Sequence, residues 1–277
     1  MSNGVIYVAI GDQFIKESLQ SAESLKRAMP KIHTTIFCDH QLESKYFDDV
    51  VVINKDHLNY PGLEKLEKIR CIRYSPYEKS IFLDTDTYIC NDFSELFILL
   101  DQFDIATAHA PVRDATKVRK DMNYSINIPE SFPEMNTGVI VFKKNELTEN
   151  LFRAWFQSCA QKIACAQKIA NKERPIHDQT AFREVLYTNN ARVATLTPEY
   201  NFRFKGFGFA IGKIKILHGR HPDLPSVEKK INATHVPRTC KINSDIIKIS
   251  SVEKTYTRKI KLWIKKIYNR LISKRTS

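Results

Sequence analysis

Two aspartates separated by one residue, Asp84 and Asp86, directly follow the apolar run Ile81-Phe82-Leu83. In extended backbone, residues i and i+2 point to the same side, so these carboxylates can converge beyond the end of a buried strand. Two convergent carboxylates repel each other unless a cation lies between them, and hard oxygen ligands suit Mg²⁺ or Mn²⁺. The same short pattern also occurs as a polar strand end with two solvated aspartates, so other parts of the chain must distinguish the two.

The segments around this pair alternate between strand and helix patterns. Short apolar runs predict strands at residues 5–10, 34–38, 50–53, 81–83, 105–108, 137–142, 193–196 and 214–217. Apolar residues spaced three or four apart predict helices at residues 14–29, 63–74, 93–99, 146–167 and 177–186. This alternation predicts an α/β fold, a single domain with a mostly parallel sheet flanked by helices, which we place at residues 1–245. Ligands of such folds bind at the carboxyl ends of the strands, where the two aspartates lie.

The composition is that of an ordinary globular protein, with 43% hydrophobic and 27% charged residues in a chain of 277. No apolar run is long enough to span a membrane and the first residues lack the basic region of a signal peptide, so we expect a cytoplasmic protein. The six cysteines show no Cys-x-x-Cys spacing, which indicates reduced, mostly buried thiols rather than a zinc site or a disulfide framework.

Positive charge is concentrated at the C-terminus. Residues 254–277 hold nine Lys or Arg and no Asp or Glu, which leaves only +3 of the net charge of +12 for the remainder. The period of residues 257–272 predicts a basic amphipathic helix whose apolar stripe consists of Ile260, Trp263, Ile264, Ile267, Leu271 and Ile272. Such a helix suits an anionic membrane surface, where each nearby cation adds about 1 kcal/mol. The alternative is a stripe that packs on the main domain; no recognition motif supports nucleic acid.

Four segments occur in a recognisable order: residues 82–87 around the aspartate pair, Met135-Asn136-Thr137-Gly138, His177-Asp178-Gln179 and Ile216-Leu217-His218-Gly219. With this ordered set, residues 5–220 resemble the glycogenin-like glycosyltransferases of family 8, which have the GT-A fold. Lys68, 16 residues before Asp84, resembles the family's donor-site lysine. The resemblance implies a metal-dependent transfer of a sugar from a nucleotide-diphosphate sugar, most simply a UDP-sugar, with retention of anomeric configuration.

The resemblance also assigns roles to residues. Asp84, Asp86 and His218 are implied as ligands of Mn²⁺ or Mg²⁺, which would neutralise charge on the diphosphate leaving group. Asp178 and Gln179 are implied near the anomeric carbon. The implied donor-binding residues are Ala9, Ile10, Gly11, Asp12, Lys68, Asp84, Thr85, Asp86, Asn136, Thr137, Gly138, Gly219 and Arg220.

Simpler explanations exist for several of these residues. Lys68 could lie on the solvated face of a basic helix, and Asn136 and Gly138 could simply begin a strand. Asp178 could cap the helix that follows it, a role compatible with catalysis. His221 competes with His218 as the third metal ligand.

The chain departs from the family pattern after His218-Gly219. The family usually carries a lysine followed by Pro-Trp, whereas this chain reads Arg220-His221-Pro222. Arg220, Lys213 or Lys215 could replace that lysine at the diphosphate.

The acceptor is open among a glycan, a lipid-linked sugar and a protein. We expect its site in the irregular residues 109–135, and a lipid-linked acceptor would agree with a peripheral site on the cytoplasmic membrane face.

Two alternatives to a glycosyltransferase belong to other functional classes. A non-catalytic nucleotide-sugar or membrane-surface binding module would not need the complete set of Asp84, Asp86 and His218. A sugar-phosphate nucleotidyltransferase would need a glycine-rich basic loop after the first strand, which Gly11-Asp12-Gln13 does not provide.

Overall fold

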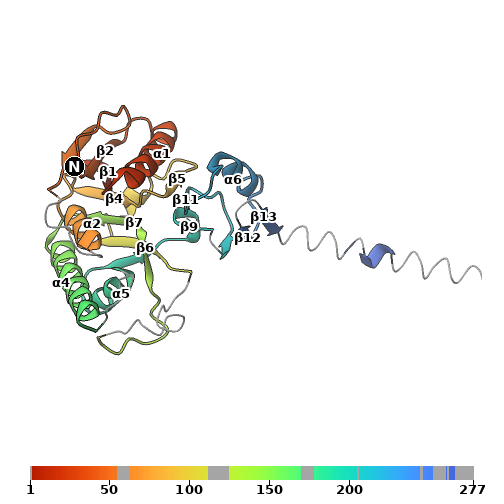
Figure 1. Ribbon diagram of the computed structural model, residues 1–277. Coiled ribbons are helices and arrows are strands. Elements are labelled where there is room, and N and C mark those ends of the chain that lie inside the picture. The colour runs from red at the N-terminus through yellow and green to blue at the C-terminus, as the bar shows by residue number, and fades with distance from the viewer. Residues whose placement is uncertain are drawn as a thin grey trace, which may run out of the picture.

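The computed structural model describes residues 2–54, 63–111, 125–169, 178–204, 206–243, 246–251, 260 and 262–265. In this part of the chain, the central sheet has seven strands in the order β3-β2-β1-β4-β7-β6-β8 (Figure 1). Only β7 runs antiparallel to its neighbours β4 and β6, which confirms the α/β class with a mostly parallel sheet. The strands are β1 (Asn3–Ala9), β2 (His33–Cys38), β3 (Asp49–Val52), β4 (Lys79–Leu83), β6 (Ile105–His109), β7 (Met135–Lys143) and β8 (Val193–Thr195).

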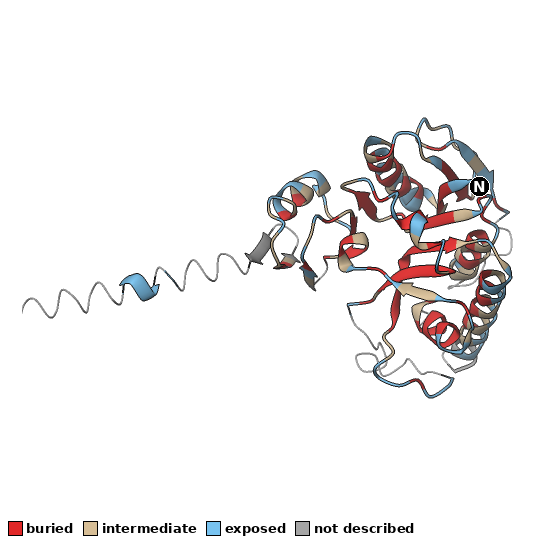
Figure 2. Ribbon diagram, turned by 180° about the vertical axis from the view of Figure 1, so that it is seen from behind, coloured by how far each residue is buried: buried red, intermediate tan, exposed pale blue. Residues whose placement is uncertain are grey.

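Helices cover both faces of this sheet, and the sheet is the buried middle layer (Figure 2). Successive residues of a strand point to opposite faces, so Val5 and Tyr7 of β1 belong to one core and Ile6 to the other. The first core is covered by α1 (Asp12–Ala28) and α3 (Leu96–Leu99). The second core is covered by α2 (Leu63–Arg73), α4 (Glu146–Ile169) and α5 (Asp178–Thr188).

Two smaller sheets extend the central one. The first has the strand order β5 (Thr87–Ile89), β11 (Ile216–His218) and β9 (Phe202–Arg203). The short 3₁₀ helix η2 (Pro198–Tyr200) comes directly before β9 in the chain. The antiparallel pairing of β5 with β11 sets His218 opposite Thr87, beside the aspartate pair. The second sheet joins β10 (Gly206–Ala210), β12 (Arg238–Asn243) and β13 (Ile246–Ser251), and α6 (Leu224–Ile231) packs beside it.

Asp104, directly before β6, joins three segments at the edge of the central sheet. Its carboxylate accepts hydrogen bonds from the Arg192 backbone at 2.8 Å and from Asn145 Nδ2 at 2.9 Å, and it pairs with Lys143 Nζ at 3.2 Å. Burial would raise the pKa of Asp104, but these donors outweigh burial and lower the pKa to about 2.

The structure differs from the sequence predictions at several elements. The helix expected at residues 93–99 begins only at Leu96, and neither β5 nor the β12–β13 hairpin was predicted. Because β13 pairs with β12 as far as Ser251, strand pairing continues past the domain boundary that we placed at residue 245. Four of the six cysteines are buried.

Three predictions fall partly or wholly outside the described residues: most of the C-terminal basic helix, about half of the expected acceptor segment, and His177. Of the basic C-terminal segment 254–277, within which we expect this helix, residues 260 and 262–265 are described, and they are helical and exposed. Of residues 109–135, the stretch 112–124 is outside the described part, and so is His177. Within the described residues, no helix combines the length and apolarity that a membrane span requires.

Candidate active site and metal-binding residues

The aspartate pair lies in the turn between β4 and β5. The backbone N–H of Asp84 donates to Gly138 O of β7 at 2.8 Å, which extends the β4–β7 pairing by one residue. The backbone N–H of Gly219, directly after β11, donates to Asp86 O at 2.8 Å. These backbone bonds hold both carboxylates and His218 at one corner of the fold.

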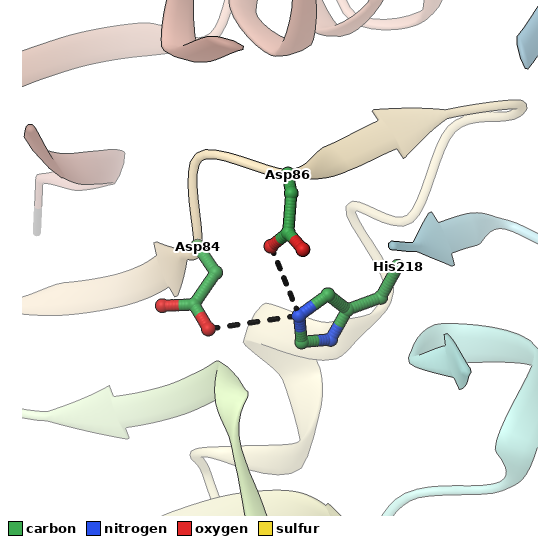
Figure 3. A group of neighbouring side chains, drawn as sticks. All are labelled: Asp84, Asp86 and His218. Atoms are coloured by element: carbon green, nitrogen blue, oxygen red, sulfur yellow. Dashed lines mark ion pairs between the residues drawn. The ribbon is translucent and has the colours of Figure 1, made fainter. Parts of the chain in front are cut away.

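The three side chains point into a common space (Figure 3). His218 Nε2 lies 3.6 Å from Asp84 Oδ2 and 3.2 Å from Asp86 Oδ1, and one ligand atom from each residue lies within 4.8 Å of the others. A cation bound at about 2.1 Å to each of three ligands requires ligand atoms about 3 to 4 Å apart. The geometry and the donor set therefore fit a divalent cation such as Mn²⁺ or Mg²⁺.

Side-chain amides fix the orientation of the buried His218 ring. Asn136 Oδ1 accepts hydrogen bonds from the backbone N–H of Gly138 at 3.0 Å and from Asn201 Nδ2 at 2.8 Å. Because a backbone N–H can only donate, the Asn136 atom that faces Gly138 must be the acceptor oxygen Oδ1. Asn201 therefore points its Nδ2 at this oxygen, and its own Oδ1 faces His218 Nδ1 at 2.8 Å. His218 Nδ1 therefore carries a proton, and Nε2 is the nitrogen that faces the carboxylates.

Gly138 is a glycine because the His218 ring occupies the place of a side chain. A Cβ added at Gly138 would lie 1.9 Å from His218 Cε1 and 2.8 Å from Nε2. Only a residue without a side chain lets β7 approach this close to the ring. The sequence alternative for Gly138, a plain strand start, does not account for this contact.

Lys68 of α2 lies between two carboxylates. Its Nζ is 3.0 Å from Asp84 Oδ1 and 3.2 Å from Asp178 Oδ2, and it donates to Thr137 Oγ1 at 3.4 Å. Burial would lower the pKa of Lys68, but the charges of Asp178 and Asp84 outweigh burial and raise it, so Lys68 is a permanent cation. Its side chain is 14% exposed, so the expected alternative of a solvated helix face is wrong.

Asp178 and Gln179 begin α5 and point into the same network. Asp178 Oδ2 accepts a hydrogen bond from Thr137 Oγ1 at 3.0 Å, and burial is again outweighed by the Lys68 charge, which lowers the pKa of Asp178. Gln179 Oε1 accepts from Asn136 Nδ2 at 2.7 Å, and Gln179 Nε2 donates to Glu134 Oε1 at 3.0 Å. Asn136 thus connects the expected catalytic pair to the expected metal ligands.

The Glycosyl transferase family 8 model matches residues 5–235, most of the chain. The chain belongs to glycosyl transferase family 8. It is therefore a nucleotide-sugar glycosyltransferase of the GT-A fold, as its ordered motifs predicted. No curated protein matches this glycosyltransferase.

Two solved structures of the galactosyltransferase LgtC are similar to the chain. One is a complex with donor and acceptor sugar analogs, at 13% identity and a TM-score of 0.49 over 72% of this chain and 75% of that chain. The other is an active-site mutant, at 12% identity and a TM-score of 0.49 over the same shares.

The expected nucleotide-binding residues of this glycosyltransferase lie at the carboxyl end of β1. Ala9 is the last residue of the strand, Ile10 follows it, and Gly11 has a φ of 91°, in the region that favours glycine. The Gly11 N–H donates to Asp39 Oδ2 at 3.2 Å, and the Asp39 side chain, which follows β2, is only 3% exposed. Asp12 opens α1 with an exposed side chain. Asp39 therefore joins this end of the site, although its sequence context did not distinguish it.

Among the cations considered for the diphosphate, the structure brings Arg220 to the candidate metal ligands. Arg220 Nη1 lies 3.7 Å from Asp86 Oδ2. Lys215 instead donates to Asp92 O at 2.7 Å and pairs with Glu95. Lys213 is exposed. Burial would raise the pKa of Asp86, but His218 and Arg220 outweigh burial and hold it well below its usual range.

The competitor His221 has a different contact. Its Nδ1 accepts a hydrogen bond from the backbone N–H of Asp223 at 2.9 Å, at the beginning of α6. Within the described part of the chain, His218 is the histidine whose ring reaches the two carboxylates.

Proposed function

We propose that this glycosyltransferase transfers a sugar from a UDP-sugar to a glycan, a lipid-linked sugar or a protein, with retention of anomeric configuration. We further propose that Asp84, Asp86 and His218 hold the required Mn²⁺ or Mg²⁺. The observation that carries the proposal is the convergence of these three side chains, two from the turn after β4 and one from the end of β11, with Lys68 alongside. When bound, the cation would act as a Lewis acid on the diphosphate leaving group.

The chain's own charges suit a reaction in which negative charge builds up on a diphosphate and positive charge on a sugar. Lys68 places a permanent positive charge beside Asp84, where it can contact phosphate or donor-sugar oxygens. Asp178 stays ionised because of Lys68 and is 6% exposed. A buried, ionised carboxylate next to Gln179 is suited to stabilise a cationic sugar or to attack its anomeric carbon.

We also propose a peripheral site on the cytoplasmic membrane face, where a lipid-linked acceptor would be available; exposed apolar side chains in the C-terminal segment support contact with a membrane surface. The side chains of Ile260, Leu262, Trp263 and Ile264 are 53%, 55%, 64% and 54% exposed. Exposed apolar residues among lysines bind the interface of anionic bilayers. We expect the protein to sediment with phosphatidylglycerol vesicles but not phosphatidylcholine vesicles, and Trp263→Ser with Ile264→Ser, both in the apolar stripe, to weaken this binding. Equal sedimentation with both vesicle types would contradict the membrane proposal.

The donor site is tested by thermal unfolding with UDP, GDP, CDP or ADP, each with Mn²⁺ or with EDTA. A ligand that binds only the native state stabilises it by about 2.7 kcal/mol at a hundredfold excess over its dissociation constant. We expect this stabilisation for UDP with Mn²⁺ only, and we expect Asp86→Asn to lose it. Asp101→Asn is the matched control, because Asp101 pairs with Lys79, away from the site, and its side chain is 58% exposed. If no nucleotide stabilises the wild-type protein, the proposed donor site is wrong and a binding module becomes the better explanation.

A further inference from the structure

Glu17 lies on α1, yet its side chain reaches the candidate metal site. Its carboxylate accepts two hydrogen bonds from Arg220, at 2.6 Å from Nε and at 2.8 Å from Nη2. Thr85, between the two aspartates, donates to Glu17 Oε2 at 3.1 Å, and Gln13 donates to Glu17 Oε1 at 3.2 Å. The Glu17 side chain is 16% exposed, against 47% for Arg220, so the carboxylate is the fixed partner and the guanidinium the accessible one.

The contact uses only one side of the guanidinium. Arg220 has five N–H donors, and its Nε and Nη2 donate one each to Glu17. The Nη1 end lies 3.7 Å from Asp86 Oδ2, and the guanidinium carbon lies 5.9 Å from the centre of the Phe14 ring. The pair and the ring hold a positively charged group, still able to donate, beside a proposed metal ligand.

The local charges favour an anion at this position. A divalent cation on Asp86 would repel Arg220, because both are positive and lie only a few ångströms apart. A diphosphate bound between them would be attracted by both. A bidentate pair with Glu17 also restricts the long, half-exposed side chain of Arg220, so less conformational entropy is lost when the ligand binds.

We infer that Glu17 is a positioning residue that orients Arg220 toward the diphosphate of the donor. This role rests on the proposed function and deepens it. Glu17 does not touch the substrate; it fixes the direction in which Arg220 presents its free N–H groups. This chain has Arg220 where the family usually has a lysine, and Glu17 of α1 pairs with that arginine. A guanidinium can form two parallel hydrogen bonds with one carboxylate, and a lysine ammonium cannot.

The test compares the binding of UDP and of UMP in the presence of Mn²⁺ by calorimetry, for wild type, Glu17→Gln, Arg220→Gln and the double variant. A hydrogen bond to a charged group contributes about a factor of ten or more. We expect Arg220→Gln to weaken UDP binding about 30-fold and Glu17→Gln about tenfold, with less than about threefold effects on UMP. Because Glu17 acts through Arg220, the double variant should bind UDP no more weakly than Arg220→Gln alone.

Glu23→Gln provides the matched control. It makes the same charge change on the same helix, at a carboxylate whose partner is Tyr46 Oη, 2.6 Å away. Unchanged UDP binding by Glu17→Gln, or equal losses for UDP and UMP, would overturn the positioning role and leave the proposed function standing. Wild-type protein that does not bind UDP with Mn²⁺ would overturn both.

Discussion

Replacing Gly138 by alanine should remove His218 from the metal site. The added Cβ would lie 1.9 Å from His218 Cε1, 2.6 Å from Nδ1 and 2.8 Å from Nε2. Ordinary contact between such atoms begins at about 3.4 Å, so the ring would have to move by roughly 1.5 Å. Metal–ligand distances tolerate deviations of only about 0.2 Å, so His218 would no longer bind a cation shared with Asp84 and Asp86.

The size of the effect follows from how tightly the ring is held. His218 is 2% exposed and is fixed by Asn201 and by the backbone pairing of β11, so it has no free space to enter. Forcing a methyl group into such a packed region costs about 1 to 3 kcal/mol of folding stability. Loss of the groups that merely orient a metal ligand lowers metal affinity about 10- to 100-fold. We therefore expect loss of the ligand itself to weaken Mn²⁺ binding at least about 100-fold.

The assay is a calorimetric titration with Mn²⁺ in the presence of UDP, which measures the affinity for the cation. Chemical denaturation of the same variants measures their folding stability, so that the two effects are separated. Gly212→Ala is the control, because a Cβ at Gly212 meets no atom within 4 Å. It should bind Mn²⁺ like the wild type. If Gly138→Ala folds and binds Mn²⁺ within about threefold of the wild type, the assignment of His218 as a ligand is wrong.

Three further predictions concern the site and the sheet edge. Asn201→Ala removes the acceptor of His218 Nδ1 and should weaken Mn²⁺ binding about 10- to 100-fold in the same titration; an unchanged affinity would contradict the role of the amides. Lys68→Gln leaves two carboxylates without their cation and should cost about 3 kcal/mol in urea denaturation with EDTA, and Mn²⁺ should restore part of that loss. Destabilisation that Mn²⁺ leaves unaltered would refute this. The folded-state pKa of Asp104 is lowered to about 2, so its stabilisation is complete above about pH 4 and is lost as pH falls through about 2. Asp104→Asn should therefore cost about 2 kcal/mol at neutral pH, and the difference from wild type should shrink below pH 4; a constant difference between pH 7 and pH 3 would exclude this origin.

Much of the fold was predictable because its signals are local. Buried parallel strands such as β1 and β4 are continuous apolar runs, and α1 shows its apolar residues at helical spacing. The weaker elements had no such signal. Strand β5 has three residues, β10 alternates glycine with phenylalanine, and β12 consists mainly of charged and polar residues, so only their partners make them strands.

The residues of the site likewise fall into those that the sequence predicted and those that it did not. The motif residues were found because they occur in a recognisable order, and the structure brings Lys68, Asp84, Asp86, Asp178 and His218 together. The supporting residues Asn201, Glu134 and Glu17 were missed. A glutamate on the polar face of an amphipathic helix has the sequence context of any solvated residue, and Asn201 is an isolated asparagine after a short 3₁₀ helix.

The sequence by itself determined that Asp84 and Asp86 lie near each other, because the chain cannot carry two residues with one residue between them far apart, although they lie in a turn and not in the extended backbone that the spacing suggested. Only the tertiary structure decided what surrounds them. The pairing of β5 with β11 delivers His218, and the approach of α1 to the end of β11 joins Glu17 to Arg220, 203 positions apart. Such contacts depend on which elements pack together, and packing depends on the whole core rather than on any local pattern of residues.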